Sequence, residues 1–489
     1  MLKPLPAERW NHAAATHLLA RAGFGGSPGS VARLAAQKHA AAVDSLVHFD
    51  PVKDPFPPPP WAQPDPTRAE RLRTYRQASP EKRQELQREE RRLQQDRLLS
   101  LREWWLQRMT LGPQPLQEKL ALFWHGHFAT SMEKVRDAYL MWRQNQTFRE
   151  LGAATWPSLL EAASKDPAML IWLDQAQSRR SHPNENFARE LLELFALGEG
   201  HYSEKDVAEA ARALTGWSLD ASRQSFAFRP RQHDPGSKTV LDQTGPWKGE
   251  DIVRQVATSR QSSLWITGKL WYFFAGQPPA TAWQQQLADR FHAHGQSFRP
   301  WLREIFLSEA FYATDLVRAQ VKSPVQWLVG TVQALECPLP PAPASSQALR
   351  LLGQDLFAPP NVKGWEGGLS WINASSLMNR YQLAAYLVSG ELAPSARPAR
   401  ATNDMNRPRR ARRNRQAQAL RVEPLLTPEE RRDPELAISA LSRRLLGMPL
   451  GVAQRRSIDE FLAARSPLDD ADLRHVIRLI LCTPEFQLT

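Results

Sequence analysis

The sequence predicts a mainly α-helical protein with a large multi-helical core, a short β-hairpin or loop insert, and peripheral helical units. Apolar residues recur at helical spacing over most of residues 116–219 and again from residue 251 onward. Sustained strand alternation is absent, and only residues 226–247 mix β-branched and aromatic residues with prolines and glycines in the manner of a hairpin. The core is therefore expected to be helical, with the insert between its helices.

Residues 1–50 predict an N-terminal helical segment. Trp10 and Arg21 share a helix face, and Gly23 suits the end of that helix. Ser27 followed by Pro28 indicates a new helix, because the serine hydroxyl accepts from a first-turn N–H and proline lacks the N–H that would stay unpaired there.

A proline-rich spacer and a charged helix come next. Residues 51–66 contain eight prolines and are expected to be extended. Residues 67–111 predict a long charged helix, with a start signal at Ser79 and Pro80. Its apolar residues gather on one face only in its later half, so that half should enter the core.

The remaining boundaries follow changes in composition. Residues 112–396 predict a helical core that carries the polar motifs, and residues 422–489 predict a C-terminal helical unit. Between them, residues 397–421 contain nine arginines and one acidic residue, and so contribute +8 of the net charge of +12. We interpret this run as a disordered or surface loop, the alternative being a docking tail for an anionic polymer, lipid or partner. Because the rest of the chain carries only about +4, nucleic-acid binding is not favoured.

Several classes of protein are excluded by what the sequence lacks. Two cysteines, Cys337 and Cys482, cannot form a disulfide framework or a cysteine-based zinc site. No stretch approaches the ~18 uninterrupted apolar residues of a transmembrane helix. The first ten residues have no apolar signal core, which predicts a cytoplasmic location, with export to the periplasm only alongside a partner. The nucleophile elbow, the Walker loop, the HExxH pair and the dinucleotide fingerprint are also missing.

The densest polar motif spans residues 184–195. Asn184 suits a helix start, and the side chains expected on one face of that helix are Asn186, Arg189, Glu190 and Glu193, with Glu185 one position away. Carboxylates beside an arginine are typical of a buried structural network, of metal or acid–base chemistry, or of a solvated face. Any buried carboxylate here needs a cation or hydrogen-bond donors.

A second motif places His125 and His127 on either side of Gly126. On a helix these side chains would point about 200° apart, so a shared site requires a non-helical corner, which Gly126 makes plausible. Imidazoles at this spacing occur in metal sites. The alternative is one core histidine bonded to backbone and one histidine at the surface.

Two loops provide further candidates. His233 and Asp234 suit a metal ligand with its orienting carboxylate, or a general base, and Lys238 suits binding of an anion. The alternative is an Asp-Pro-Gly turn with a lysine at its tip. Residues 359–365 predict a rigid turn in which Asn361 and Lys363 line a cleft, the alternative again being a structural turn.

Together these motifs resemble a bacterial family of uncharacterised proteins, domain of unknown function 1800. The resemblance runs from about Trp10 to Phe486 and rests on residues 17–25, 118–128, 166–170, 184–200, 211–217, 233–238 and 359–365. It carries no established activity, but it implies a sulfatase-like exported protein as a partner, because members are often encoded beside such a family. The proline-rich spacer and the arginine run depart from the pattern and are interpreted as insertions.

We expect the paired histidines, the helix of residues 185–190 and the His233–Asp234 loop to converge on one polar cleft. The expected metal ligands are His125, His127, His233 and Asp234, for a divalent ion that the sequence does not identify as zinc, iron or copper. The expected catalytic residues are Glu185, Arg189, Glu190 and Lys238, and the expected substrate-binding residues are Asn186, Asn361 and Lys363. This arrangement predicts a metal-assisted enzyme, more readily a hydrolase than an oxidoreductase, acting on a polar or anionic substrate. The alternative is a non-catalytic helical binding or escort protein for the sulfatase-like partner.

Overall fold

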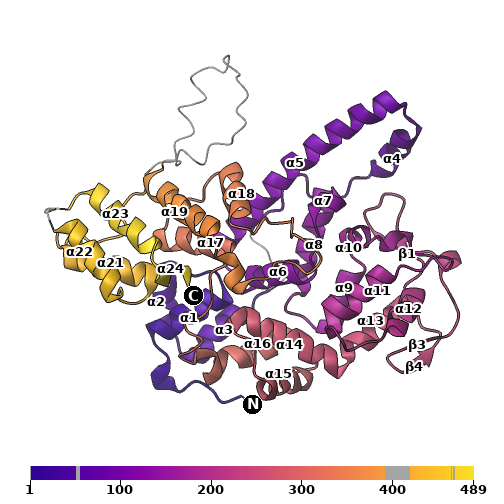
Figure 1. Ribbon diagram of the computed structural model, residues 1–489, viewed down its shortest axis with the longest axis horizontal. Coiled ribbons are helices and arrows are strands. Elements are labelled where there is room, and N and C mark those ends of the chain that lie inside the picture. The colour runs from indigo at the N-terminus through magenta and orange to yellow at the C-terminus, as the bar shows by residue number, and fades with distance from the viewer. Residues whose placement is uncertain (1, 51–55, 391–418, 464, 466–467) are drawn as a thin grey trace. The chain divides into compact units, whose positions relative to one another are not determined.

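The structure is a computed structural model that describes residues 2–50, 56–390, 419–463, 465 and 468–489 (Figure 1). This part of the chain is mainly helical, and its strands form two two-stranded antiparallel sheets within residues 217–245. The predicted fold class is therefore confirmed. Three of the strands lie within the predicted insert of residues 226–247, but the strand Trp217–Leu219 precedes it, in the stretch expected to be helical, because it pairs with Phe226–Phe228. None of the described helices is long and apolar enough to cross a membrane. Most of the predicted arginine-rich loop, residues 397–418, lies outside the described residues.

The chain packs as two compact units, each made of separate segments. Unit 1 comprises Met1–Pro4, Val43–Phe311 and Asp355–Glu366, and unit 2 comprises Leu5–Ala42, Tyr312–Gln354 and Gly367–Thr489. Every candidate site residue named from the sequence belongs to unit 1. The six consecutive segments expected from the sequence stay a prediction.

Unit 1 holds most of the helices and both sheets. Its helices are α4 (Arg68–Gln77), α5 (Pro80–Leu111), α6 (Pro115–His127), α7 (Met132–Val135), α8 (Ala138–Leu151), α9 (Trp156–Ser164), α10 (Pro167–Trp172), η2 (Gln175–Gln177), α11 (Glu185–Glu190), the π-helix η3 (Leu191–Leu197), α12 (Glu204–Ala213), η4 (Pro230–Gln232), α13 (Gly249–Thr258), α14 (Arg260–Ala275), α15 (Thr281–Ala293) and α16 (Phe298–Leu307). Strand β1 (Trp217–Leu219) pairs with β2 (Phe226–Phe228), and β3 (Lys238–Val240) pairs with β4 (Gln243–Gly245).

The regular elements described in unit 2 are all helices. Its elements are η1 (Ala7–Arg9), α1 (His12–Ala22), α2 (Pro28–Ala35), α17 (Pro324–Leu335), α18 (Ala342–Leu351), η6 (Gly368–Trp371), α19 (Ala374–Ser389), α21 (Pro434–Leu446), α22 (Val452–Leu462), α23 (Asp470–Leu481) and α24 (Pro484–Gln487). The boundary between the units falls inside α3 (His39–Val47) and η5 (Glu309–Tyr312).

Local capping explains where several helices begin. The hydroxyl of Ser27 accepts from the Ser30 N–H at the start of α2, and that of Ser79 accepts from the Lys82 N–H at the start of α5. Both starts were predicted from the Ser-Pro pairs. The expected single helix over residues 67–111 is, however, two helices, because a residue that precedes proline avoids the α conformation and the chain turns at Ala78–Ser79. Figure 1 shows α4 beside the first half of α5.

The core of unit 1 contains a buried ion cluster between α5, α6 and α8. The carboxylate of Glu118 lies 2.9 Å from Arg108 and 2.9 Å from Arg149, and it also accepts from the indole N–H of Trp105. Burial would raise the pKa of Glu118, but the charges of Arg149 and Arg108 outweigh it and the pKa is lowered. This cluster fixes α6, the helix that carries the paired histidines.

Candidate functional site

His125 and His127 both lie in the last turn of α6. The helix continues through Gly126, so the expected non-helical corner is wrong. Because residues of an α-helix follow one another at about 100° around the axis, the two rings leave α6 in nearly opposite directions. The glycine serves close packing instead: a Cβ atom on Gly364 would lie only 2.1 Å from the carbonyl oxygen of Gly126.

His125 connects α6 to the segment Asp355–Glu366. Its buried Nε2 accepts a 2.9 Å hydrogen bond from the backbone N–H of Phe357, so the ring is neutral and carries its proton on Nδ1. Burial lowers the pKa of His125 to about 3. The rings of Trp105 and Trp365 lie at centroid distances of 5.4 and 5.5 Å. His125 therefore anchors the turn that carries Asn361 and Lys363.

His127 connects α6 to the π-helix. Its Nε2 lies 3.0 Å from the carbonyl oxygen of Phe195, so this nitrogen carries the proton and donates. Burial, and after it the charge of Lys269, lowers the pKa of His127 well below its ordinary value. Both histidines are thus core residues bonded to backbone, whereas the alternative considered from the sequence placed one of them at the surface.

The polar motif starts as predicted and then changes its helix type. The side chain of Asn184 accepts from the N–H groups of Asn186 and Phe187, and α11 follows. From Leu191 to Leu197 the chain is a π-helix. Side chains outside this segment donate to its carbonyl groups: His127 to Phe195, Trp265 to Leu194 and Gln261 to Leu197. Segments of π-helix are rare and are frequent at functional sites.

Glu190 and Glu193 lie where α11 meets the π-helix, and both are half-buried. Burial, and after it the negative charge of Glu193, raises the pKa of Glu190, while the charges of Lys363 and Arg189 oppose this shift. The hydroxyl of Tyr202 donates to Glu193 Oε2 over 2.5 Å. Burial together with this hydrogen bond raises the pKa of Tyr202 to about 12. The carboxyl groups of Glu190 and Glu193 therefore have different surroundings. They interact with each other and with Arg189 and Lys363, and we call these four residues the charged group.

Arg189 forms a two-pronged ion pair with Glu204 at the start of α12, over 2.7 and 2.6 Å. This pairing raises the pKa of Arg189. Glu185 and Asn186 are exposed in the first turn of α11. Five residues were expected on or near one face: Arg189, Glu190 and Glu193 belong to the charged group, and Glu185 and Asn186 are exposed to solvent.

The segment of residues 359–365 forms a turn, as predicted. The side chain of Asn361 accepts from the backbone N–H of Lys363, and its carbonyl oxygen accepts from the Gly364 N–H. Lys363 is exposed, and its charge opposes the rise in the pKa of Glu190. The turn, the π-helix and the end of α6 therefore approach one another, which brings together three of the four predicted segments.

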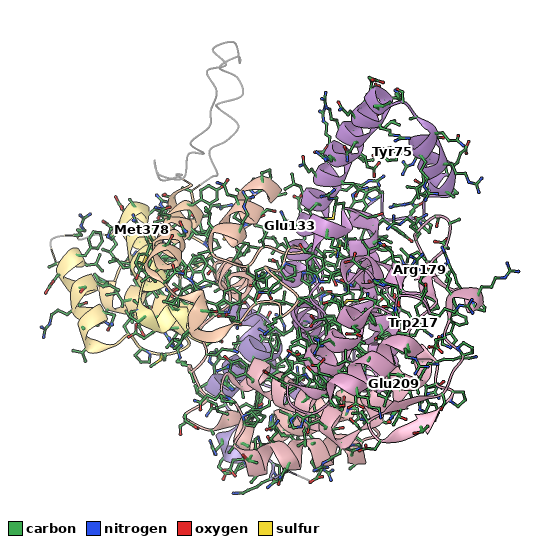
Figure 2. The ribbon with its side chains drawn as sticks, turned by 45° about the vertical axis from the view of Figure 1, so that its right-hand side comes forward. Tyr75, Glu133, Arg179, Glu209, Trp217 and Met378 are labelled. Atoms are coloured by element: carbon green, nitrogen blue, oxygen red, sulfur yellow. The ribbon has the colours of Figure 1, made fainter. Side chains whose placement is uncertain are left out.

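The His233–Asp234 loop is held elsewhere in unit 1. His233 Nδ1 donates to the carbonyl oxygen of Thr215 over 2.9 Å, and Asp234 forms an ion pair with Arg212 of α12 over 2.8 Å. The ammonium group of Lys238 donates to the carbonyl oxygens of Asp234 and Gly236, and its side chain is buried. Figure 2 labels Glu209 of α12 and Trp217 of β1, which mark the two elements beside this loop. The partners named here come from α12, from Thr215 shortly after α12 and from the loop itself, not from α6 or α11.

Hydrogen bonding to Arg212 lowers the pKa of Asp234, and burial lowers that of Lys238. The loop is therefore a closed turn with its lysine folded inward, rather than a turn with the lysine at its tip. The predicted roles of His233 and Asp234 as metal ligands, and of Lys238 in binding an anionic substrate, have no support in this geometry.

A metal ion would need His125, His127, His233 and Asp234 to face one point. The two rings on α6 diverge, one nitrogen of each histidine is bonded to backbone, and Asp234 is paired with Arg212. Among the described residues, no group of three or more His, Cys, Asp or Glu side chains is arranged to hold a metal ion. The four residues therefore do not fit a common metal site.

Sequence reasoning missed Tyr202 and Lys269. Tyr202 follows Gly198 and Gly200, both at positive φ, and these glycines turn the chain back toward Glu193. Lys269 lies on α14 with its ammonium 4.8 Å from the centroid of the Trp265 ring, and burial lowers its pKa to about 8. The glycine pair was a usable signal for Tyr202, but nothing local to residue 269 indicated its burial.

These features define a mainly helical protein with an acidic site beside a π-helix. The family model described as "Protein of unknown function (DUF1800)" matches residues 17–488. The chain therefore belongs to the DUF1800 family, as its motifs suggested. Comparisons with the curated proteins and with the solved structures found no match.

Proposed function

We propose that the chain is a hydrolase that works by acid–base catalysis, with Glu190 as the proton donor. The observation that carries the proposal is the half-buried position of Glu190 at the junction of α11 and the π-helix, where burial and the charge of Glu193 raise its pKa. A raised pKa favours the protonated form of a carboxyl group, which is the form that can give a proton to a leaving group. Active sites often contain two carboxyl groups with different surroundings, one that donates a proton and one that stays ionised.

The neighbouring residues suggest the remaining roles. Glu193, held by the hydroxyl of Tyr202, is the carboxylate available to orient water. Lys363 is exposed and close enough for its charge to act on Glu190, so it suits a polar or anionic substrate. No step in this proposal requires a metal ion. His125 and His127 act as positioning residues, because each bonds to backbone of a segment that carries the site.

The test compares Glu190→Gln with Glu199→Gln, a matched change at an exposed residue just after the π-helix. Chromogenic nitrophenyl phosphate, sulfate, acetate and glycosides serve as substrates. We expect turnover of one class by the unaltered protein, a loss of about 100-fold or more in Glu190→Gln, and little change in Glu199→Gln. Equal turnover by both variants would overturn the proposal.

A second measurement needs no substrate. Carboxyl-carbon NMR titration should give Glu190 a higher pKa than an ordinary exposed glutamate, and Glu193→Gln should lower it by removing the neighbouring charge. If Glu190 titrates normally and no conjugate is hydrolysed, the non-catalytic binding or escort reading replaces the enzyme.

A further inference from the structure

A second charged site lies in unit 2, where the segment before α17 pairs with the end of the chain. Val321 forms a β-bridge with Leu488, and the Lys322 N–H donates to the carbonyl oxygen of Gln487 over 2.9 Å. This pairing holds Lys322 over Phe486, with its ammonium nitrogen 3.7 Å from the ring centroid. A benzene ring attracts the cation only weakly compared with a carboxylate.

Two arginines share this site with Lys322. Arg380 of α19 has no exposed surface, and it donates to the side-chain oxygen of Gln487 over 3.2 Å and to the carbonyl oxygen of Lys322 over 2.8 Å. Both acceptors are neutral. The pKa of Lys322 is lowered to about 7 by burial and then by the charges of Arg318 and Arg380. Arg318 and Arg380 therefore lie close enough to Lys322 for their charges to act on its ammonium group.

Each of the two arginines has a buried N–H group that no acceptor among the described residues contacts. Among the described residues, Nε of Arg380 and Nη1 of Arg318 are buried without a hydrogen-bond partner. Glu485 is the carboxylate whose charge acts on Arg318, and its buried Oε2 has no hydrogen-bond partner among the described residues. Buried guanidinium N–H groups without acceptors are costly, and a cluster of like charges adds to that cost. Arg318 and Lys322 keep partial exposure, so a small ion can reach them.

We propose that Arg318, Lys322 and Arg380 bind an oxyanion, a phosphate or sulfate group. A tetrahedral anion offers several acceptors at once, and guanidinium groups match such oxygens in geometry and charge. Its negative charge would compensate the two guanidinium groups and favour the protonated form of Lys322. This site is separate from Glu190 and does not rest on the proposed hydrolase.

Calorimetry and thermal unfolding of the full chain test the proposal at neutral pH. Inorganic phosphate and sulfate are compared with chloride at equal ionic strength. We expect saturable binding with a Kd of about 1 mM or tighter, and a rise in Tm that follows it. Glycerol 3-phosphate distinguishes a free ion from a phosphate group on a larger molecule: tighter binding than phosphate indicates the latter. Absence of saturable binding by all three anions overturns the proposal.

Variants separate binding from a structural role. Lys322→Met and Arg380→Met should each weaken phosphate binding by about tenfold or more, whereas Arg456→Gln, an exposed change in the same unit, should not. In chloride, Lys322→Met should be at least as stable as the unaltered protein, because it removes a buried cation from a repelling cluster. Glu485→Gln should bind phosphate at least as tightly as the unaltered protein does. An unchanged phosphate effect in Lys322→Met, or weaker binding in Glu485→Gln, contradicts the site.

Discussion

Nε2 of His125 accepts a 2.9 Å hydrogen bond from the backbone N–H of Phe357, a residue 232 positions further along the chain. Phe357 has a φ of 64°, a left-handed conformation that is unusual for an aromatic residue. The same residue's carbonyl oxygen accepts from the Met132 N–H. A strained residue held at both its N–H and its C=O marks a fixed start to the segment that carries Lys363.

Replacement of His125 tests this anchor. His125→Leu should lower the free energy of unfolding by about 1–3 kcal/mol, because it leaves the buried Phe357 N–H without an acceptor. His125→Gln keeps an acceptor and should lose less. Equilibrium unfolding in urea measures both changes. A leucine variant as stable as the unaltered protein would show that water or another group replaces the imidazole.

The contact between Gly364 and Gly126 makes a second prediction. Gly364 has a φ of 79°, and an added Cβ would lie 2.1 Å from the Gly126 carbonyl oxygen. Gly200 has a φ of 81°, but nothing lies within 4 Å of a Cβ added there. Both alanine variants should lose about 1–2 kcal/mol from left-handed strain, and Gly364→Ala should lose about 1–3 kcal/mol more through overpacking. Urea unfolding of the pair isolates the clash, and equal losses would refute it.

The sequence predicts well what neighbouring residues decide. The helix starts after Ser27, Ser79 and Asn184 follow from a side-chain oxygen and the backbone N–H groups two or three residues away. The hairpin insert follows from a local concentration of turn and strand formers. Such signals need no knowledge of the partner segments.

What the sequence could not predict depends on distant contacts. The π-helix is accompanied by donors from α6 and α14, namely His127, Gln261 and Trp265, which lie at least sixty residues from the carbonyl groups that they bond. Gly126 looks like a corner in isolation, but it is a helical residue against which Gly364 packs. The sequence identified Glu190 and the turn of Asn361 and Lys363. These segments approach one another because His127 bonds to the π-helix and His125 bonds to the segment that carries the turn.

The buried cluster of Glu118 with Arg108 and Arg149 makes a third prediction. Glu118→Gln should cost about 3–5 kcal/mol, because it leaves two buried guanidinium groups without their counter-charge. Glu85→Gln removes a carboxylate at a similar distance of 2.8 Å from Lys82, but that pair is exposed, so the loss should stay below about 1 kcal/mol.

The pKa of Glu118 is lowered in the folded chain, so its contribution to stability is present above its unfolded pKa of about 4.3 and is lost as pH falls through the folded value. Glu118→Gln should therefore lose less stability on acidification than the unaltered protein. Urea unfolding across acidic pH checks both statements, and a cost near that of Glu85→Gln would contradict the role of the cluster.

Asp166 at the start of α10 makes the fourth prediction, with the opposite pH dependence. Its Oδ1 accepts from the Gln144 side chain and from the Met169 N–H, and burial raises its pKa to about 6. The unfolded chain gives up this proton near pH 3.9, whereas the folded chain keeps it, so the free energy of unfolding should fall by roughly 3 kcal/mol as pH rises from about 4 to above 6.

Asp166→Asn keeps the accepting oxygen and carries no charge, so it should remove this fall. Asp96→Asn, at an exposed position of α5, is the control and should leave the pH profile unchanged. Urea unfolding at intervals between pH 4 and pH 8 gives the profiles, and a profile for Asp166→Asn parallel to that of the unaltered protein would place the pH dependence in another group.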